Sequence, residues 1–244
     1  MESYTYFAQV YDELMDAPYS EWASYIESIW TDNGLKPDLV LDLACGTGSM
    51  THELAKRSYD MIGIDMSPEM LMMASQKNPG TLFLNQDMRE FELYGTVDAV
   101  ICICDSINYI LEHNEVVDVF KLVENYLNPG GIFIFDINTK HKYENILADN
   151  SFSFTSENAA YIWENFYDAD ALLNEYQATF FIKEANGKYV RHEELHAQKA
   201  HSDQELKEAL KASGLEIVNV FANLKKTAPS ADCERVFYVV RKKL

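Results

Sequence analysis

Apolar and polar positions divide the chain into three parts, and the middle part combines two periods. Short apolar runs, each compatible with a buried strand, alternate there with amphipathic stretches of helical spacing. We expect strands at Leu39–Leu43, Met61–Ile64, Thr81–Asn85, Val97–Cys102 and Ile132–Ile137. We expect helices near Ser49–Arg57, Pro68–Gln76 and Glu115–Tyr126. This alternation predicts an α/β fold whose parallel sheet is covered by helices on both faces.

The segment before the first strand has a helical pattern. Apolar residues recur at helical spacing at Phe7, Val10, Tyr11 and Leu14. After Ser20 a second amphipathic stretch places Trp22, Ile26, Ile29 and Trp30 on one face and stops at Asn33-Gly34. Two helices are therefore expected ahead of the sheet.

The pattern changes to strands without intervening helices after Asn138. Apolar alternation and turn signals predict strands at Tyr161–Tyr167, Leu173–Ile182 and Tyr189–Gln198, which would form an antiparallel insertion. The α/β pattern then resumes with a helix from Ser202 through Lys211, ended by Gly214, and two closing strands at Leu215–Phe221 and Arg235–Arg241. Asn128-Pro129-Gly130-Gly131 is expected to form a turn before the fifth strand.

Composition narrows the class of protein. The 244 residues are 48% hydrophobic and 13% aromatic, which is ample for a packed core. The net charge of −19 opposes binding to nucleic acid, because phosphates would be repelled. No apolar run approaches membrane-spanning length, and the N-terminal residues are acidic rather than basic. The cysteines form no zinc-type pairs, so we expect a reduced, cytoplasmic protein with no metal and no membrane partner.

One glycine-rich turn carries the most specific chemistry. The first strand runs into Asp42-Leu43-Ala44-Cys45-Gly46-Thr47-Gly48, and Asp65 ends the second strand. A glycine turn between strand and helix lets the backbone approach a ligand, and a carboxylate about twenty residues later can bind a ribose. A dinucleotide fingerprint would place a third glycine where Thr51 stands. The turn therefore predicts an adenosine-containing cofactor other than a dinucleotide.

With Asp65, this turn strongly resembles the first two motifs of the class I (Rossmann-like) S-adenosylmethionine-dependent methyltransferases, of the small-molecule type. Further similarities follow the third and fourth strands, at Asn85-Gln86-Asp87-Met88 and Cys102-Ile103-Cys104-Asp105-Ser106. The resemblance implies a doubly wound, seven-stranded, mostly parallel sheet with an antiparallel β insertion. It also implies an N-terminal helical lid at 1–35, a cofactor domain at 36–140 and 202–244, and an insertion at 141–201 capping the substrate site.

The same resemblance implies roles for individual residues. Asp65 would accept from both ribose hydroxyls, Asp87 would bind the adenine amino group, and Asp42 would hold the turn and reach the ligand's ammonium through water. Gly46 and Gly48 would keep side chains out of the ligand's path. The full set of implied S-adenosylmethionine-binding residues is Asp42, Ala44, Cys45, Gly46, Gly48, Asp65, Met66, Asp87, Met88, Cys104 and Tyr11.

Methyl transfer from a sulfonium needs positioning of the acceptor more than a nucleophilic triad. If the acceptor is an amine, it must arrive deprotonated or lose a proton to a base. Candidate bases are Asp105, His141, His192 and Tyr11, none of them singled out by the sequence. For Asp105 we favour a different interpretation, as the cap of a helix that begins at Ser106. No Asn-Pro-Pro-Tyr-like segment follows the fourth strand, which disfavours a nucleic-acid adenine methylase.

The expected insertion carries two notable strand faces. Tyr161, Trp163 and Tyr167 alternate on one strand, and His192, Glu194 and His196 alternate on another. Alternate positions are about 7 Å apart, so a single metal ion could take only two of the latter three. We therefore favour a solvated or substrate-facing surface over a metal site. An aromatic, acidic pocket would suit a cationic or neutral small molecule.

Two alternatives remain open at this point. An NAD-linked oxidoreductase is disfavoured by Thr51 and by the expected antiparallel closing pair. A non-catalytic S-adenosylmethionine-binding regulatory module is not excluded by the motifs, because methyl transfer requires no obligatory catalytic residue. The sequence favours a methyltransferase with a small-molecule acceptor, and it specifies neither the methylated atom nor an oligomeric state.

Overall fold

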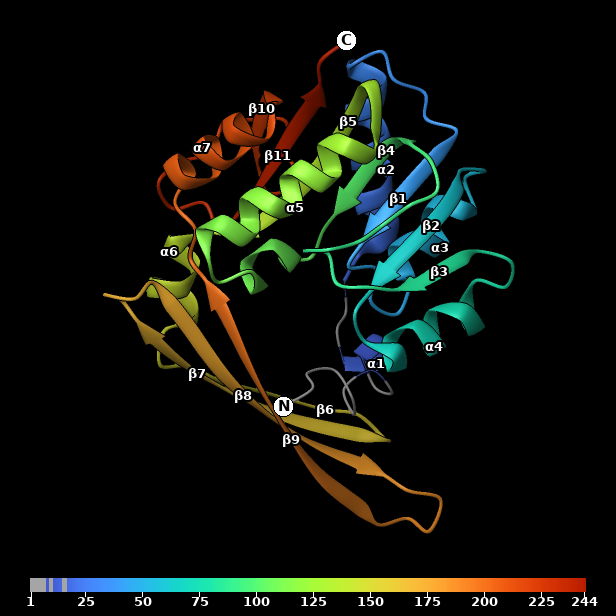
Figure 1. Ribbon diagram of the computed structural model, residues 1–244. Helices are drawn as coiled ribbons and strands as arrows, with labels where there is room; N and C mark the ends of the chain where they lie inside the picture. The colour runs from blue at the N-terminus through green and yellow to red at the C-terminus, as the bar shows by residue number, and fades with distance from the viewer. Residues whose placement is uncertain (1–7, 9–10, 15–16) are drawn as a thin grey trace.

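A seven-stranded sheet forms the centre of the molecule, in the order β10-β11-β5-β4-β1-β2-β3 (Figure 1). The computed structural model describes residues 8, 11–14 and 17–244. The strands of this sheet are β1 (Leu39–Leu43), β2 (Asp60–Asp65), β3 (Leu82–Asn85), β4 (Val97–Cys102), β5 (Leu127–Asn138), β10 (Leu215–Ala222) and β11 (Arg235–Lys242). Only β11 runs antiparallel to its neighbours β5 and β10 among these strands. The predicted doubly wound, mostly parallel sheet with an antiparallel closing strand is confirmed.

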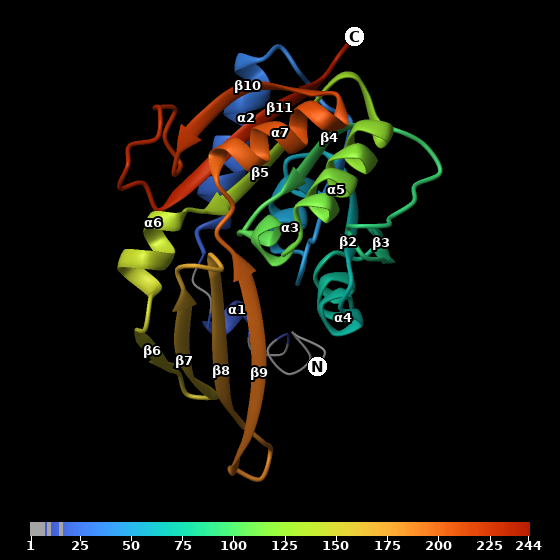
Figure 2. The same cartoon turned by 60° about the vertical axis from the view of Figure 1, so that its left-hand side comes forward.

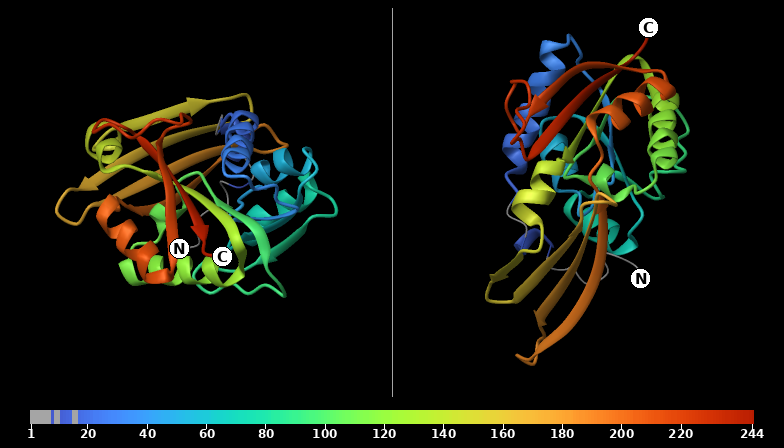
Figure 3. Two further views of the ribbon diagram at one scale, coloured as in Figure 1. Left: turned by 90° about the horizontal axis from the view of Figure 1, so that it is seen from above. Right: turned by 90° about the vertical axis from the view of Figure 1, so that its left-hand side faces the viewer.

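Helices cover both faces of this sheet (Figures 1 and 3). The helices are α2 (Tyr19–Asp32), α3 (Ser49–Ala55), α4 (Pro68–Lys77), α5 (His113–Tyr126) and α7 (Asp203–Ser213). Alternate residues of β1 point to opposite layers: Val40 packs with the apolar residues of α2 and α3, and Leu41 packs with those of α5 and α7. Because both faces are buried, the central strands are almost uninterrupted apolar runs.

Local signals fix the helix ends where the sequence places them. Ser67 Oγ accepts from Met70 N at 3.2 Å, with a proline at the first position of α4. Ser202 and Glu205 form a reciprocal capping box at the start of α7. Gly214 ends that helix in the left-handed conformation, with φ +87°.

The segment predicted as a turn before the fifth strand is instead the irregular start of β5. Val97 pairs with Leu127 and Ala99 pairs with Ile132, so the chain bulges between these two pairs. A Cβ on Gly131 would lie 2.3 Å from Leu127 Cδ2 and 2.8 Å from the Asp98 carbonyl oxygen. The glycine allows the bulge to pack against β4, and the predicted turn is wrong in this respect.

A second, four-stranded antiparallel sheet lies beyond the carboxyl ends of β1, β2 and β4 (Figures 1 and 2). Its strands are β6 (Ser151–Thr155), β7 (Ala159–Asp168), β8 (Leu173–Lys183) and β9 (Tyr189–Lys199). The last three were expected, whereas β6 was not, because its residues are all exposed and its pattern is short. Helix α6 (Lys140–Lys142) and a π-helical turn (Tyr143–Leu147) precede β6 and were also missed.

One buried side chain joins the two sheets. Asn108 lies on a 3₁₀ turn, Ser106–Tyr109, that follows β4. Its Oδ1 accepts from Asn138 N at 2.9 Å, at the end of β5, and its Nδ2 donates to the Lys199 carbonyl at 2.8 Å, at the end of β9. The side chain therefore ties the base of the four-stranded sheet to the central sheet.

The N-terminal pattern is only partly covered by the structure. The short helix α1 (Tyr11–Leu14) and the predicted apolar face of α2, with Trp22, Ile26, Ile29 and Trp30, are present and that face is buried. Phe7 and Val10 lie outside the described residues. In the described part of the chain, every helix is too short or too polar to cross a bilayer.

Candidate functional site

A buried carboxylate at the end of β1 supports the glycine turn that follows this strand. Asp42 is 1% exposed, and Thr51 Oγ1 donates to its Oδ2 at 2.5 Å. Burial, reinforced by nearby Asp65, raises the pKa of Asp42 to about 7. Thr51, the residue that breaks the dinucleotide pattern, thus has a structural role of its own: it binds Asp42 from the first turn of α3.

Asp65 links the turn to the end of β2. Its Oδ2 accepts from Gly46 N at 2.8 Å, and its Oδ1 accepts from Ser67 N at 2.9 Å. Burial raises the pKa of Asp65, and these backbone donors partly oppose that rise. Each carboxylate oxygen can accept more than one hydrogen bond, so both retain capacity for a ligand.

A cavity of about 490 Å³ opens over this turn, within the range of small-molecule sites. The structure brings ten of the residues implied by the sequence into its lining: Tyr11, Asp42, Ala44, Cys45, Gly46, Asp65, Met66, Asp87, Met88 and Cys104. A Cβ on Gly46 would meet open space, whereas one on Gly48 would lie 2.8 Å from Asn78 Nδ2 and 2.9 Å from Ala74 Cβ. Gly48 therefore packs the turn against α4 and does not line the cavity, among the residues described.

Asp87 is paired with an arginine that the sequence reasoning missed. Arg89 Nε lies 3.0 Å from Asp87 Oδ1, and Arg89 Nη2 lies 2.6 Å from Oδ2. This guanidinium lowers the pKa of Asp87, so the carboxylate is held ionised at the rim of the cavity. Its contact with an adenine amino group stays a prediction.

The short helix α1 is attached to the same turn through Asp12. Its Oδ1 accepts from Thr47 Oγ1 at 2.7 Å and from Ser49 Oγ at 3.0 Å, and its Oδ2 lies 2.6 Å from Lys77 Nζ. Partial burial raises the pKa of Asp12, but these donors outweigh it and hold the pKa below its usual value. Tyr11, the preceding residue, consequently lines the cavity.

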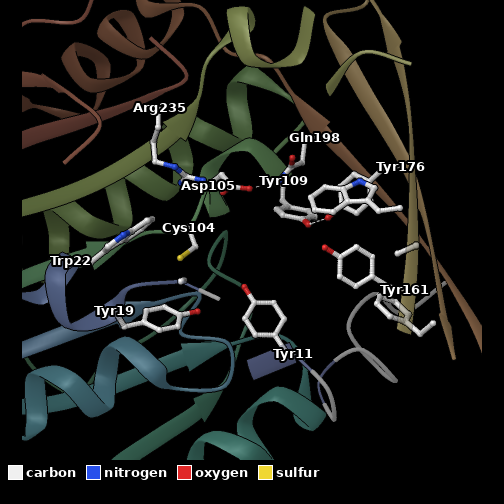
Figure 4. A pocket seen from close by; sticks show the side chains of 14 residues that line it. Tyr11, Tyr19, Trp22, Cys104, Asp105, Tyr109, Tyr161, Tyr176, Gln198 and Arg235 are labelled. Carbon is white, nitrogen blue, oxygen red and sulfur yellow. Dashed lines mark hydrogen bonds and ion pairs between the residues drawn. The ribbon is translucent and has the colours of Figure 1, made fainter. Parts of the chain in front are cut away.

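A second cavity, of about 140 Å³, lies between the loop after β4 and the four-stranded sheet (Figure 4). Its walls are largely aromatic: Tyr11, Tyr19, Trp22, Tyr109, Tyr161, Trp163, Tyr176 and Phe180. Tyr11, Tyr19, Cys104 and Tyr109 line both cavities, so the two cavities meet at these residues. Figure 4 shows Tyr11, Tyr19 and Tyr161 with their hydroxyls directed toward the central space.

The loop after β4 is strained where it borders both cavities. Cys104 and Asp105 have φ values of +60° and +54°, which non-glycine residues adopt rarely. Ala44, in the glycine turn, is similarly left-handed at φ +61°. Such strain concentrates at functional sites, where the surroundings hold it in place.

Asp105 does not cap the following turn through its side chain, contrary to the favoured sequence interpretation. Its Oδ1 instead accepts from Arg235 Nη2 at 2.7 Å, and its Oδ2 accepts from Gln198 Nε2 at 2.7 Å. Arg235 also pairs with buried Asp136 and lies 5.3 Å above the Trp22 ring. Burial raises the pKa of Asp136, and Arg235 opposes that rise. Because Asp105 binds Arg235, its carboxylate does not cap the turn that begins at Ser106.

The sequence contained a signal for Arg235 that the prediction did not use. An antiparallel closing strand begins at the edge where the parallel strands end, and Arg235 is the first residue of β11. Of the other candidate bases, His141 lies on α6 with its Nδ1 3.3 Å from Asn145 Nδ2. Neither His141 nor His192 lines either cavity in the described part of the chain.

Comparison with known proteins defines the class. A family model described as "Methyltransferase domain" matches residues 40–131. The chain is 39% identical over 244 residues to YqeM of Bacillus subtilis (strain 168), a protein named as a methyltransferase, covering 98% of this chain and 97% of that one. The chain belongs to the class I S-adenosylmethionine-dependent methyltransferase family, and it is an enzyme of that family.

More particular similarities lie within this family. The crystal structure of an S-adenosylmethionine-dependent methyltransferase from Clostridium acetobutylicum ATCC 824 superposes with a TM-score of 0.89 at 31% identity, covering 100% of both chains. A dTDP-3-amino-3,4,6-trideoxy-alpha-D-glucopyranose N,N-dimethyltransferase from Streptomyces venezuelae is 28% identical over 118 residues, covering 48% of this chain and 50% of that enzyme. The oxidoreductase and non-catalytic alternatives give way to the methyltransferase assignment.

Proposed function

We propose that this protein transfers a methyl group from S-adenosylmethionine to a small aliphatic amine by in-line displacement. The observation that carries the proposal is the meeting of two cavities at Tyr11, Tyr19, Cys104 and Tyr109. One cavity has the acids and backbone of a nucleoside site, and the other is closed by aromatic side chains. A donor in the first and an acceptor in the second would face each other across a short gap, as in-line transfer requires.

The larger cavity fits the cofactor through the chemistry of its donor set. Asp65 would accept from the ribose hydroxyls, because its oxygens keep lone pairs beyond those used by backbone amides. Asp42 would support the turn and favour the ligand's ammonium. When bound, S-adenosylmethionine supplies a sulfonium-activated methyl: the acceptor nitrogen bonds to the methyl carbon while the carbon–sulfur bond breaks and its electron pair stays on sulfur.

The smaller cavity fits a compact amine, which reacts in its neutral form because a protonated nitrogen has no lone pair. The aromatic faces that line this cavity would stabilise the positive charge that develops on the nitrogen as it gains the methyl group. The Trp163 indole N–H is buried without a hydrogen-bond partner among the described residues and is available to an oxygen of the acceptor. The relative from Streptomyces venezuelae, an N,N-dimethyltransferase by name, supports an amine.

The parts of the chain would divide this work. We propose that residues 1–35 form a lid attached by Asp12, that residues 36–140 and 202–244 bind the cofactor, and that residues 141–201 cap the acceptor. The net charge of −19 opposes a nucleic-acid acceptor and supports a small-molecule substrate in the cytoplasm.

Two measurements test this proposal. Calorimetry should show binding of S-adenosylmethionine and S-adenosylhomocysteine and much weaker binding of NAD. A library of small amines, assayed for S-adenosylhomocysteine release, should then contain an acceptor, with hydroxyl-only analogues as matched controls. Tighter NAD binding, release that depends only on hydroxyl compounds, or no release with any amine of the library would contradict the proposal.

A further inference from the structure

We propose that Tyr109, His196 and Glu194 form a proton relay that removes the proton the acceptor loses on methylation, an inference that rests on the proposed function above. From the sequence alone, the His-Glu-His strand is expected to form a solvated or substrate-facing sheet surface, and no candidate base is singled out. The structure places His196 next to Tyr109, which borders both cavities, and Glu194 on the other side of the imidazole ring.

The inner end of the relay is a buried acid–imidazole pair on β9. Glu194 and His196 are two residues apart, so they share one face of the strand. They are 3% and 4% exposed, and His196 Nε2 lies 3.3 Å from Glu194 Oε2. Tyr176 stacks on the imidazole, with centroids 4.6 Å apart and an interplanar angle of 8°. This packing fixes the ring plane, and the other nitrogen, Nδ1, lies on the side of Tyr109.

The outer end of the relay is the Tyr109 phenol. His196 Nδ1 lies 3.4 Å from Tyr109 Oη, and the Tyr109 and Tyr176 hydroxyls are hydrogen-bonded to each other (Figure 4). Tyr109 stands on the 3₁₀ turn that Asn108 ties to both sheets. Its position is therefore set by the joint between the sheets, where the proposed acceptor and donor meet.

The proton path follows from this order of groups. As the acceptor nitrogen gains its methyl group, its N–H proton passes to Tyr109 Oη, and the Tyr109 proton passes to His196 Nδ1. Glu194 stabilises the resulting imidazolium, as a carboxylate does behind a catalytic histidine. The proton returns to solvent when the product leaves, so the net products are the methylated amine, S-adenosylhomocysteine and one proton. Tyr109 is the catalytic residue here, and His196 and Glu194 act through it.

Kinetics with an amine found by the library assay test the relay. Tyr109→Phe removes one oxygen and should lower kcat about 100-fold, in the range of general acid–base contributions, with the amine KM changed less than threefold. His196→Gln and Glu194→Gln should lower kcat similarly. His192→Gln is the matched control, since His192 lies on the same strand face outside both cavity linings and should keep kcat.

A spectroscopic measurement tests the same relay without any acceptor. In ¹⁵N-histidine-labelled protein with S-adenosylhomocysteine, His196 Nδ1 should show the chemical shift of a nitrogen that accepts a hydrogen bond from Tyr109, and Nε2 that of a protonated nitrogen. Tyr109→Phe should shift the Nδ1 resonance and leave that of His192 in place. A proton on Nδ1, or no response to Tyr109→Phe, would overturn the relay.

The outcomes separate the two proposals. If the wild type methylates an amine and Tyr109→Phe retains kcat within threefold, the relay is wrong and the proposed function stands. If no amine reacts, the proposed function fails, and the histidine resonances alone decide whether the hydrogen-bonded chain exists. Calorimetry with S-adenosylmethionine, expected to be unchanged within twofold for Tyr109→Phe, shows that the variant is folded.

Discussion

The two cavities are assembled in opposite ways. The larger one is lined mostly by loops that follow β1 to β4 in sequence order, from Asp42 to Ile110. The smaller one collects side chains from the N-terminal helices, the loop after β4, the four-stranded sheet and the start of β11. The first is local chain geometry at one edge of a sheet, and the second exists only after distant segments pack together.

Their carboxylates differ accordingly. Asp42 and Asp65, in the larger cavity, are satisfied by a hydroxyl and by backbone N–H groups. Asp105 and Asp136, beside the smaller cavity, share the guanidinium of Arg235. Neutral donors leave the carboxylates of the larger cavity able to bind a ligand, whereas Asp105, Asp136 and Arg235 depend on one another for their charge balance. Substitutions beside the larger cavity should therefore mainly change ligand binding, and substitutions beside the smaller cavity should mainly change the stability of the fold.

The largest effect should come from Arg235→Met, which leaves Asp105 and Asp136 without their cation. Breaking a buried pair costs about 3–5 kcal/mol, because the remaining charges are uncompensated. Urea unfolding measures this loss. Arg235→Lys, which keeps the charge and loses the two-pronged geometry, should lose less, and equal losses for the two variants would contradict the shared-cation picture.

Asp65→Ala should weaken the binding of S-adenosylmethionine. Losing charge-assisted hydrogen bonds to the ribose should weaken S-adenosylmethionine binding by roughly 1.5–3 kcal/mol, about tenfold to hundredfold, in calorimetry. The substitution also removes the carboxylate that accepts a hydrogen bond from the Ser67 backbone N–H. Unchanged affinity would show that the ribose lies elsewhere.

Asp42→Asn should have a higher free energy of unfolding than the wild type, by a margin that grows as pH rises. Burial raises the pKa of Asp42 to about 7, so the folded protein keeps a proton that the unfolded chain has already released. The unfolding free energy of the wild type therefore falls as pH increases toward 7, and the amide variant avoids this loss. Its advantage should grow by on the order of 1–2 kcal/mol between about pH 5.5 and 8. An advantage that is constant over this interval would be evidence against the raised pKa.

Asp12→Asn should have the smallest effect. The side chain of Asp12 is partly exposed, so its ion pair with Lys77 is worth less than about 1 kcal/mol. Weaker attachment of α1 should accelerate S-adenosylmethionine dissociation by about threefold in stopped-flow measurements, an effect that high salt should mimic in the wild type. A rate equal to that of the wild type would separate α1 from any lid function.

The contrast between the two cavities also explains which parts of the site could be predicted from the sequence. The glycine turn, Asp42 and Asp65 were predictable because a strand, a tight turn and a helix leave a contiguous pattern. Gly48 was placed in the correct turn, but it packs against Ala74 of α4 and Asn78, the residue that follows this helix, instead of facing the cavity. Packing of this kind, between elements distant in sequence, produces no periodic pattern of residues from which it could be predicted.

The smaller cavity could be predicted only in part for the same reason: Tyr161 and Trp163 were expected to share a strand face, but most of the other residues that line this cavity were not expected there. Arg235 lies 130 residues from its partner Asp105 in sequence, and Tyr109 lies 87 residues from His196. The alternation of His192, Glu194 and His196 correctly predicts that they share a face, but not which of them contacts Tyr109 at the edge of the cavities. Strand register and the placement of one sheet against the other decide that, and both are properties of the folded molecule.

The Asn108 side chain has a consequence for how this enzyme could acquire new substrates. Its hydrogen bonds fasten the four-stranded sheet at the ends of β5 and β9, and the start of β9 at Tyr189 lies at the far end of that strand from this joint. Insertions or exchanges near Asn186-Gly187, at the far hairpin between β8 and β9, could reshape the acceptor wall while the pivot keeps the reaction geometry intact. Substrate range can therefore diversify at the periphery independently of the transfer chemistry.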